Sequence, residues 1–184
     1  SYLILIRHGQ SVWNLSNQFT GWVDVDLSEE GIREAKKAGK TLVEHGYFFD
    51  VAMTSFLKRS IRTLWLILES MDCMHVPVQT DWRINERHYG SLQGLNKKET
   101  SDKYGTEQVL NWRRGFSIRP PAMSLDDSNH PSHDIRYQGI KTLPSTESLA
   151  DTLVRVKNWV CDTLQPQLED NKKVLVVAHG NSLR

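Results

Sequence analysis

Two runs of consecutive apolar residues, one near each end of the chain, stand out in its hydrophobic pattern. They span residues 2–6 and 174–178, and neither alternates with polar positions. Strands that are apolar at successive positions are buried on both faces, as the central strands of parallel sheets are. We therefore expect a central strand at each of these two places.

Three stretches between these runs repeat their apolar residues at helical spacing, which predicts amphipathic helices. The first follows Ser28, a residue type suited to the N-cap, and ends near Gly46. The second follows Ser55, and the third opens at Pro144-Ser145. The residues expected to face the core are Ile32, Ala35, Ala38, Leu42, Val43, Ile61, Leu64, Trp65, Leu68, Leu149, Leu153, Val156, Val160 and Leu164.

A short strand expected over residues 50–55 completes an alternation of strands and helices, which predicts an α/β fold. Residues 115–144 interrupt this alternation, because they contain Pro120, Pro121 and Pro131 and show no period. We expect them to form a long excursion over the surface, of the kind that is often functional. No repeat or linker divides the chain, so residues 1–184 are expected to form a single domain.

Composition and charge narrow the class of protein. Hydrophobic residues make up 39% of the chain and charged residues 24%, as in globular proteins. The net charge of +1 provides no overall field for nucleic acid or for an anionic membrane.

Residues 2–6 are too short for a signal peptide, and no run has the length of a membrane span. Because Cys73 and Cys161 form no disulfide framework, we expect a cytoplasmic protein with reduced thiols.

Both apolar runs lead into a histidine followed by a glycine, His8-Gly9 in the first case and His179-Gly180 in the second. Ligands of open α/β sheets bind beyond the carboxyl ends of the strands. The two histidines are therefore expected to meet in one site, although two unrelated loop histidines would give the same pattern.

The helix predicted after Ser55 begins with Lys58, Arg59 and Arg62, and no acidic residue lies between positions 51 and 68. Cations at a helix N-terminus oppose the helix dipole, and a bound anion would relieve that conflict. A solvated basic face is the alternative interpretation.

Glu86 is a carboxylate among cations, and it could exchange a proton with a substrate hydroxyl. The alternative is a salt bridge with Arg83 or Arg87. Lys97, Arg113 and Arg114 add cations suited to phosphate or carboxylate oxygens. We expect no metal, because the histidines lack the spacing of a metal motif and arginines would repel a cation.

Taken together, these residues resemble the cofactor-dependent phosphoglycerate mutase branch of the histidine phosphatase superfamily. The resemblance covers almost the whole chain, and Arg7-His8-Gly9 opens the first of its motifs. The segments that carry it are residues 7–14, 20–22, 58–63, 82–90, 92–97, 112–114 and 178–184.

The resemblance implies a three-layer α/β/α fold with a central, mostly parallel sheet, and a phosphohistidine primed by 2,3-bisphosphoglycerate. His8 would accept the phosphoryl group, Arg7, Arg59 and His179 would hold its oxygens, and Glu86 would move the proton. The partners would be small phosphorylated sugar acids, and a homodimer or homotetramer is possible. The implied substrate-binding residues are Ser11, Asn14, Thr20, Gly21, Arg87, His88, Tyr89, Lys97, Arg113, Arg114, Gly180 and Asn181.

The chain departs from this family pattern at two places. Gln10 stands where many members have Glu, and the sequence stops at Arg184, before the last helix and mobile tail that relatives carry. We expect the natural protein to be longer, with a lid among the additional residues.

The leading hypothesis is an isomerase that interconverts 3-phosphoglycerate and 2-phosphoglycerate. A bisphosphoglycerate synthase or phosphatase of the same superfamily is the second, and Ser11 and Gly21 favour the mutase over it. A catalytically inactive binding module is the third, and the presence of the whole set of catalytic residues argues against it.

Overall fold

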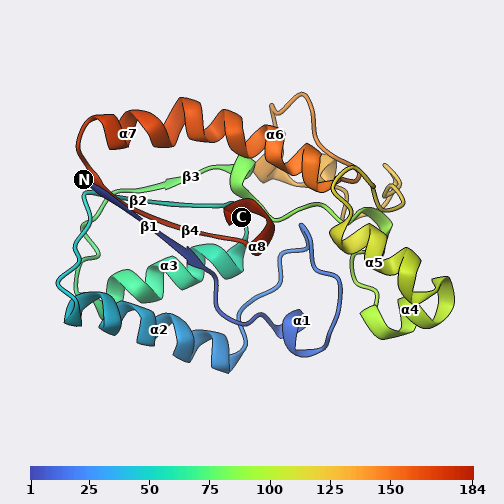
Figure 1. Cartoon of the computed structure of the whole chain (residues 1–184), viewed down its shortest axis with the longest axis horizontal. Helices are drawn as coiled ribbons and strands as arrows, with labels where there is room; N and C mark the ends of the chain where they lie inside the picture. The colour runs from blue at the N-terminus through green and yellow to red at the C-terminus, as the bar shows by residue number, and fades with distance from the viewer.

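The computed structural model describes all residues, 1–184, and is built on a parallel sheet of four strands. These are β1 (Tyr2–Arg7), β2 (Val51–Thr54), β3 (Val78–Thr80) and β4 (Lys173–Ala178), in the order β1-β4-β2-β3. Because every pairing is parallel, the carboxyl ends of all four strands lie at one edge of the sheet (Figure 1). The expected central position of the strand near residue 174 is confirmed.

The strand near the N-terminus, in contrast, does not lie at the centre of the sheet. β1 pairs with β4 alone, and Leu5 is 48% exposed. Both faces of β1 still contact the core, since Ile4 and Ile6 pack against one hydrophobic cluster and Leu3 against the other. The apolar run therefore indicated that both faces contact the core, but it carried no information on whether a second strand pairs with the outer edge.

Helices cover both faces of the sheet and make three layers (Figure 1). On one face, α2 (Glu29–Glu44) and α3 (Lys58–Ser70) pack against Leu175 and Val177 of β4. On the other, α6 (Leu149–Trp159) continues through a π-helical turn (Val160–Leu164) into α7 (Gln165–Glu169) and covers Val174 and Val176. The predicted α/β fold with a central parallel sheet is confirmed.

The predicted helices are present, but their buried faces differ in part from the apolar pattern. Val43, Trp65 and Leu153 are 50%, 62% and 42% exposed. The contact between α2 and α3 passes instead through Gly39, where a β-carbon would lie 2.7 Å from the Ser70 side chain. A close helix contact needs a small residue, so a search for large apolar residues misses it. The third helix begins at Leu149, capped by Ser148, and not at Pro144.

The remaining elements lie beyond the carboxyl edge of the sheet (Figure 1). They are α1 (Val12–Leu15), α4 (Lys97–Tyr104), α5 (Thr106–Arg114), α8 (Gly180–Leu183) and the 3₁₀ turns Trp82–Ile84, Gly90–Leu92, Pro131–His133 and Ile135–Tyr137. Residues 115–144 form no strand or α-helix, as expected. They are not confined to the surface, however, because Tyr137 is buried and stacks on Trp22 at 5.1 Å between ring centroids. No helix has the length and apolar character needed to span a membrane.

The loop after β1 crosses the first turn of α2 at a distance that suits only glycine. A β-carbon on Gly31 would overlap the carbonyl oxygen of Gln10, and one on Gly9 would overlap that of Gly31. We therefore predict that Gly31→Ala lowers the free energy of unfolding by about 1–3 kcal/mol, a usual cost of overpacking. Urea unfolding measures this cost, with Lys36→Ala at an exposed position of the same helix as the control. An unchanged midpoint for Gly31→Ala would contradict the crossing.

Candidate active site

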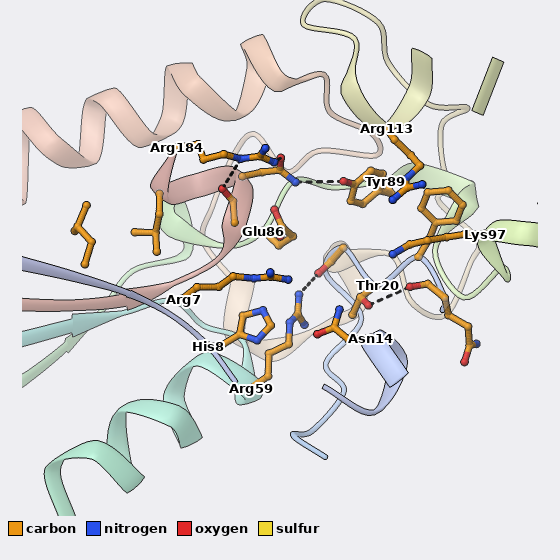
Figure 2. Close-up of a pocket in the computed structure, with 17 residues that line it drawn as sticks. Arg7, His8, Asn14, Thr20, Arg59, Glu86, Tyr89, Lys97, Arg113 and Arg184 are labelled. Carbon is orange, nitrogen blue, oxygen red and sulfur yellow. Dashed lines mark hydrogen bonds between the residues drawn. The ribbon is translucent and has the colours of Figure 1, made fainter. Parts of the chain in front are cut away.

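A cavity of about 600 Å³ opens beyond the carboxyl edge of the sheet (Figure 2). This volume lies in the range of small-molecule sites. Most residues that the sequence assigned to a site line it, and they come from β1, α1, α3, α4, α5, α8 and the intervening loops. These residues are Arg7, His8, Asn14, Thr20, Gly21, Arg59, Glu86, Tyr89, Lys97, Arg113, Gly180 and Asn181.

His8 follows β1 and is almost entirely buried at the base of the cavity. Its Nδ1 lies 2.6 Å from the carbonyl oxygen of Gly9, which can only accept a hydrogen bond. The proton therefore sits on Nδ1, and the lone pair sits on Nε2. Burial, followed by the charge of Arg59, lowers the pKa of His8 to about 3. A neutral imidazole with a free Nε2 lone pair at neutral pH is a suitable nucleophile.

His179 follows β4, and its ring centroid is 5.0 Å from that of His8, so the two histidines do meet in one site. It is fully buried, and its Nε2 lies 2.7 Å from the hydroxyl of Ser55, the residue after β2. Its Nδ1 has no hydrogen-bond partner. Burial, then the charge of Arg59, holds the pKa of His179 well below its usual range. Ser55 was not predicted as a site residue. Its contact with His179 arises because β2 and β4 end at the same edge of the sheet.

Arg59, in the first turn of α3, points into the cavity (Figure 2). Its guanidinium donates to the carbonyl oxygens of Gly21 and Val23 at 2.7 and 3.1 Å, and it has no carboxylate partner. Burial lowers the pKa of Arg59 to about 10, so it remains charged at neutral pH. A buried cation whose hydrogen bonds go only to carbonyl groups keeps its net charge, and it therefore favours the binding of an anion in the cavity.

Lys58 and Arg62, the other two cations at the start of α3, do not line the cavity, although the sequence pattern predicted that all three would favour a bound anion. Asp26 pairs with Arg62 at 2.6 Å, and the Asp24 carboxylate accepts from the main-chain N–H of Lys58 at 2.6 Å. The absence of acids within residues 51–68 therefore did not mean an absence of acids in space. A distant loop supplies them, and of the three cations only Arg59 lines the cavity.

Glu86 projects into the cavity between His8 and the cations on the opposite side (Figure 2), whereas the fully buried His179 does not line the cavity. Its side chain accepts a hydrogen bond from the main-chain N–H of Arg87 at 2.8 Å. It forms no salt bridge, because Arg83 pairs with Asp81 and Asp162. The salt-bridge alternative for Glu86 is therefore wrong.

The opposite side of the cavity carries Tyr89, Lys97 and Arg113 (Figure 2). The Tyr89 hydroxyl accepts from Asn181 at 3.2 Å, and burial raises its pKa. Burial, followed by the charges of Arg113 and Arg7, lowers the pKa of Lys97. Arg184, which was not among the predicted site residues, also lines the cavity and donates to Asn181 at 2.8 Å. Its place four residues after Gly180, directly after the short helix that follows β4, was the available indication.

Four residues assigned to substrate binding lie outside the cavity. Ser11 caps α1 and accepts from the main-chain N–H of Asn14 at 3.0 Å, so it positions a lining residue. Arg87 is fully buried and donates to the carbonyl oxygens of Trp112 and Arg113, at 2.7 and 3.1 Å, at the C-terminal end of α5. His88 is also fully buried, and Arg114 lines a neighbouring hollow. The motif predicted their presence near the site, but burial places Ser11, Arg87 and His88 behind the lining, and Arg114 is exposed at the neighbouring hollow.

Burial of neutral histidines should make the fold sensitive to acid. Burial, with smaller contributions from His130 and Arg155, lowers the pKa of His88 to about 3, against about 6.5 in an unfolded chain. As the pH falls from about 6.5 toward 3, the unfolded state binds a proton that the folded state does not, so stability falls by up to about 1.4 kcal/mol per pH unit.

We predict that His88→Gln makes the decline shallower, measured by urea unfolding at pH 7, 6 and 5. His75→Gln, at an exposed histidine, is the matched control and should keep the full slope. Parallel slopes for wild type and His88→Gln would contradict the prediction.

Comparison with known proteins places this geometry in a family. Residues 3–130, more than half of the chain, match the family described as histidine phosphatase superfamily (branch 1). A mycobacterial glucosyl-3-phosphoglycerate phosphatase, in complex with VO3, aligns with a TM-score of 0.73 at 23% identity, over 98% of this chain and 76% of that one.

Two further solved structures have similar scores. A phosphoglycerate mutase from Bacillus anthracis aligns with a TM-score of 0.69 at 20% identity, over 98% of this chain and 75% of that one. An alpha-ribazole phosphatase from Shigella flexneri aligns with a TM-score of 0.68 at 20% identity, over the same shares. At these identities the likeness concerns the fold alone, and it is the family match that assigns the chain. The protein therefore belongs to branch 1 of the histidine phosphatase superfamily, whose members transfer or hydrolyse phosphoryl groups.

Proposed function

We propose that this protein is a cofactor-dependent phosphoglycerate mutase, which interconverts 3-phosphoglycerate and 2-phosphoglycerate through a phosphohistidine at His8. The observation that carries the proposal is the distribution of charge in one cavity. His8, Arg7 and Arg59 form one end, Lys97 and Arg113 lie on the other side, and Glu86 stands between them (Figure 2). A phosphorylated sugar acid has the matching pattern of phosphate, hydroxyl and carboxylate.

The pKa shifts of Arg59 and Lys97 support a position of Glu86 between the two cationic ends of the cavity. Burial lowers the pKa of Arg59 and of Lys97, and in both cases the carboxylate of Glu86 opposes that shift. Glu86 is therefore within Coulombic reach of both ends of the cavity. A substrate that spans the two ends would bring its central hydroxyl or bridging oxygen close to this carboxyl group.

The chemistry of the first half-reaction follows from His8. The lone pair on Nε2 attacks the phosphorus atom, and the bond from phosphorus to the substrate oxygen breaks. Arg7 and Arg59 neutralise the charge that spreads over the phosphoryl oxygens in the transition state. The unpartnered Nδ1 of buried His179 can donate to one of these oxygens if the Ser55 hydroxyl donates to Nε2.

Proton transfer in this proposal belongs to Glu86. Its carboxyl proton passes to the departing oxygen and makes a hydroxyl, and the resulting carboxylate accepts a proton from the next hydroxyl that attacks phosphohistidine. With Lys97 and Arg113 opposite His8, the same cavity suits a substrate that carries two phosphates. We therefore propose 2,3-bisphosphoglycerate as the donor that primes His8. We also propose a cytoplasmic location, where such metabolites occur.

Phosphate-ester hydrolysis is the second candidate, because two of the solved structures with the same fold are named as phosphatases. In that activity water, and not a sugar-acid hydroxyl, accepts the phosphoryl group from His8. Product analysis separates the two, since a mutase supplied with 3-phosphoglycerate and bisphosphoglycerate forms 2-phosphoglycerate, whereas a phosphatase releases inorganic phosphate.

The nucleophile can be tested by labelling. We predict that protein incubated with 2,3-bisphosphoglycerate carrying labelled phosphate retains the label on denaturation at alkaline pH, and that His8→Asn abolishes both label and turnover because it removes the attacking nitrogen. His75→Asn is the control and should be labelled like the wild type, since His75 lies on the surface. Appreciable turnover in His8→Asn would exclude the proposed mechanism.

The proton donor can be tested separately. Glu86→Gln preserves shape but holds no exchangeable carboxyl proton, so mutase turnover should fall by roughly 10²–10⁴-fold, the usual contribution of a general acid or base. Phosphohistidine should still form from p-nitrophenyl phosphate, whose leaving group departs without a proton. Glu44→Gln, at an exposed position of α2, is the control. Wild-type turnover in Glu86→Gln would remove Glu86 from the mechanism.

A further inference from the structure

Arg155 of α6 is a buried arginine outside the cavity whose contacts converge on the main chain around Glu86. Its Nη1 donates to the carbonyl oxygens of Arg83 and Asn85 at 2.7 and 2.9 Å, and its Nη2 donates to that of Glu86 at 2.8 Å. One guanidinium therefore holds three carbonyl groups within four residues. This segment contains only a single 3₁₀ turn and is not part of the sheet, so these side-chain bonds set its path.

Glu147 completes the arrangement from the loop before α6. Its carboxylate accepts from Nε and Nη2 of Arg155 at 2.7 and 2.9 Å, and both side chains are less than a tenth exposed. The same carboxylate accepts from the main-chain N–H of His88 at 2.9 Å, and the N–H of Glu147 donates to the His88 carbonyl at 2.8 Å. The main chain is thus held on both sides of Glu86.

The Glu86 side chain itself has little support. Its carboxylate is held only by the main-chain N–H of Arg87, and the Glu86 carbonyl accepts from Trp22 Nε1 at 2.6 Å in addition to Arg155. The place of the carboxyl group in the cavity therefore depends on where the main chain lies. A buried ion pair contributes little net stability compared with apolar residues of equal volume, so stability alone is a weak reason for this pair.

We propose that Arg155, oriented by Glu147, is a positioning residue that places the carboxyl group of Glu86 for proton transfer. The proposal rests on the function proposed above for Glu86. In the step concerned, Nε2 of His8 bonds to phosphorus, the bond from phosphorus to the leaving oxygen breaks, and Glu86 gives its proton to that oxygen. Displacement of Glu86 by about 1 Å would impair the proton transfer, and would leave the attack by His8 largely intact.

The leaving group of the substrate reports on this step. The leaving group of an alkyl phosphate such as glycerol 2-phosphate is an alkoxide, which needs the proton, whereas that of p-nitrophenyl phosphate is a stable anion, which does not. Arg155→Lys keeps the positive charge beside Glu147 but loses the planar fork that reaches three carbonyls. We expect kcat/KM, which reports only the steps up to phosphohistidine, to fall by about 10²-fold for the alkyl ester, the cost of a 1 Å misplacement, and by less than about 3-fold for the aryl ester.

The controls separate positioning from loss of stability. Leu42→Ala empties part of the core on the other face of the sheet and should destabilise the fold by about 2–5 kcal/mol. Assayed below its unfolding temperature, it should change the two ester rates by the same factor. Glu147→Gln, which keeps shape and most hydrogen bonds, should show a smaller preference against the alkyl ester, and it serves if Arg155→Lys fails to fold.

Combination with Glu86→Gln decides whether Arg155 acts through Glu86. We expect the double variant Arg155→Lys/Glu86→Gln to lose no more alkyl-ester activity than Glu86→Gln alone, because residues that act as a unit are not additive. If Glu86→Gln itself shows no preference between esters, the proposed role of Glu86 fails. If Glu86→Gln shows the preference but Arg155→Lys and Glu147→Gln lower both rates equally, or the double variant is additive, the positioning role of Arg155 is overturned.

Discussion

The parallel pairing of β1 with β4 is the interaction on which the site depends. In this register Arg7 lies opposite Ala178, and the main-chain N–H of His8 donates to the Ala178 carbonyl at 3.0 Å. The two histidines that follow these strands thus leave the sheet side by side. A slip of one residue would turn every side chain of β1 to the other face and would separate His8 from His179. β4 is buried along nearly its whole length, so the register is strongly specified by the core.

The electrostatics of the cavity follow from how its cations are held. Arg59 is bound by main-chain carbonyls, and Lys97 lies over the ring of Phe19 at 5.9 Å. Carbonyl and ring contacts stabilise a cation without cancelling its charge, so the positive field remains available to a ligand. Glu86 is the only carboxylate in the lining, and it is held apart from the arginines by its bond to a main-chain N–H. The cavity can therefore combine anion binding with proton transfer.

The arginines outside the cavity have a different function from those inside it. Arg87 and Arg155 are buried, and their guanidinium groups donate mainly to main-chain carbonyls of irregular segments and helix ends. An arginine can satisfy several carbonyls at once because its five N–H groups form a rigid fork. The segment that carries Glu86 and the C-terminal end of α5, which carries Arg113, thereby gain fixed positions without being part of the sheet.

Sequence alone determined the α/β class, the three main helices and most of the cavity lining, because strand runs, N-caps and motif spacing are local properties. It also brought the two histidines together, since parallel strands share a carboxyl edge. The tertiary structure decided what depends on partners distant in the chain. It paired Arg62 with Asp26, set β1 at a sheet edge, exposed Trp65, and turned Arg87 away from the cavity. The spacing of residues within a segment determines which side chains lie on the same face of a helix or strand. Burial and charge pairing depend on other segments, which come into contact only when the chain folds.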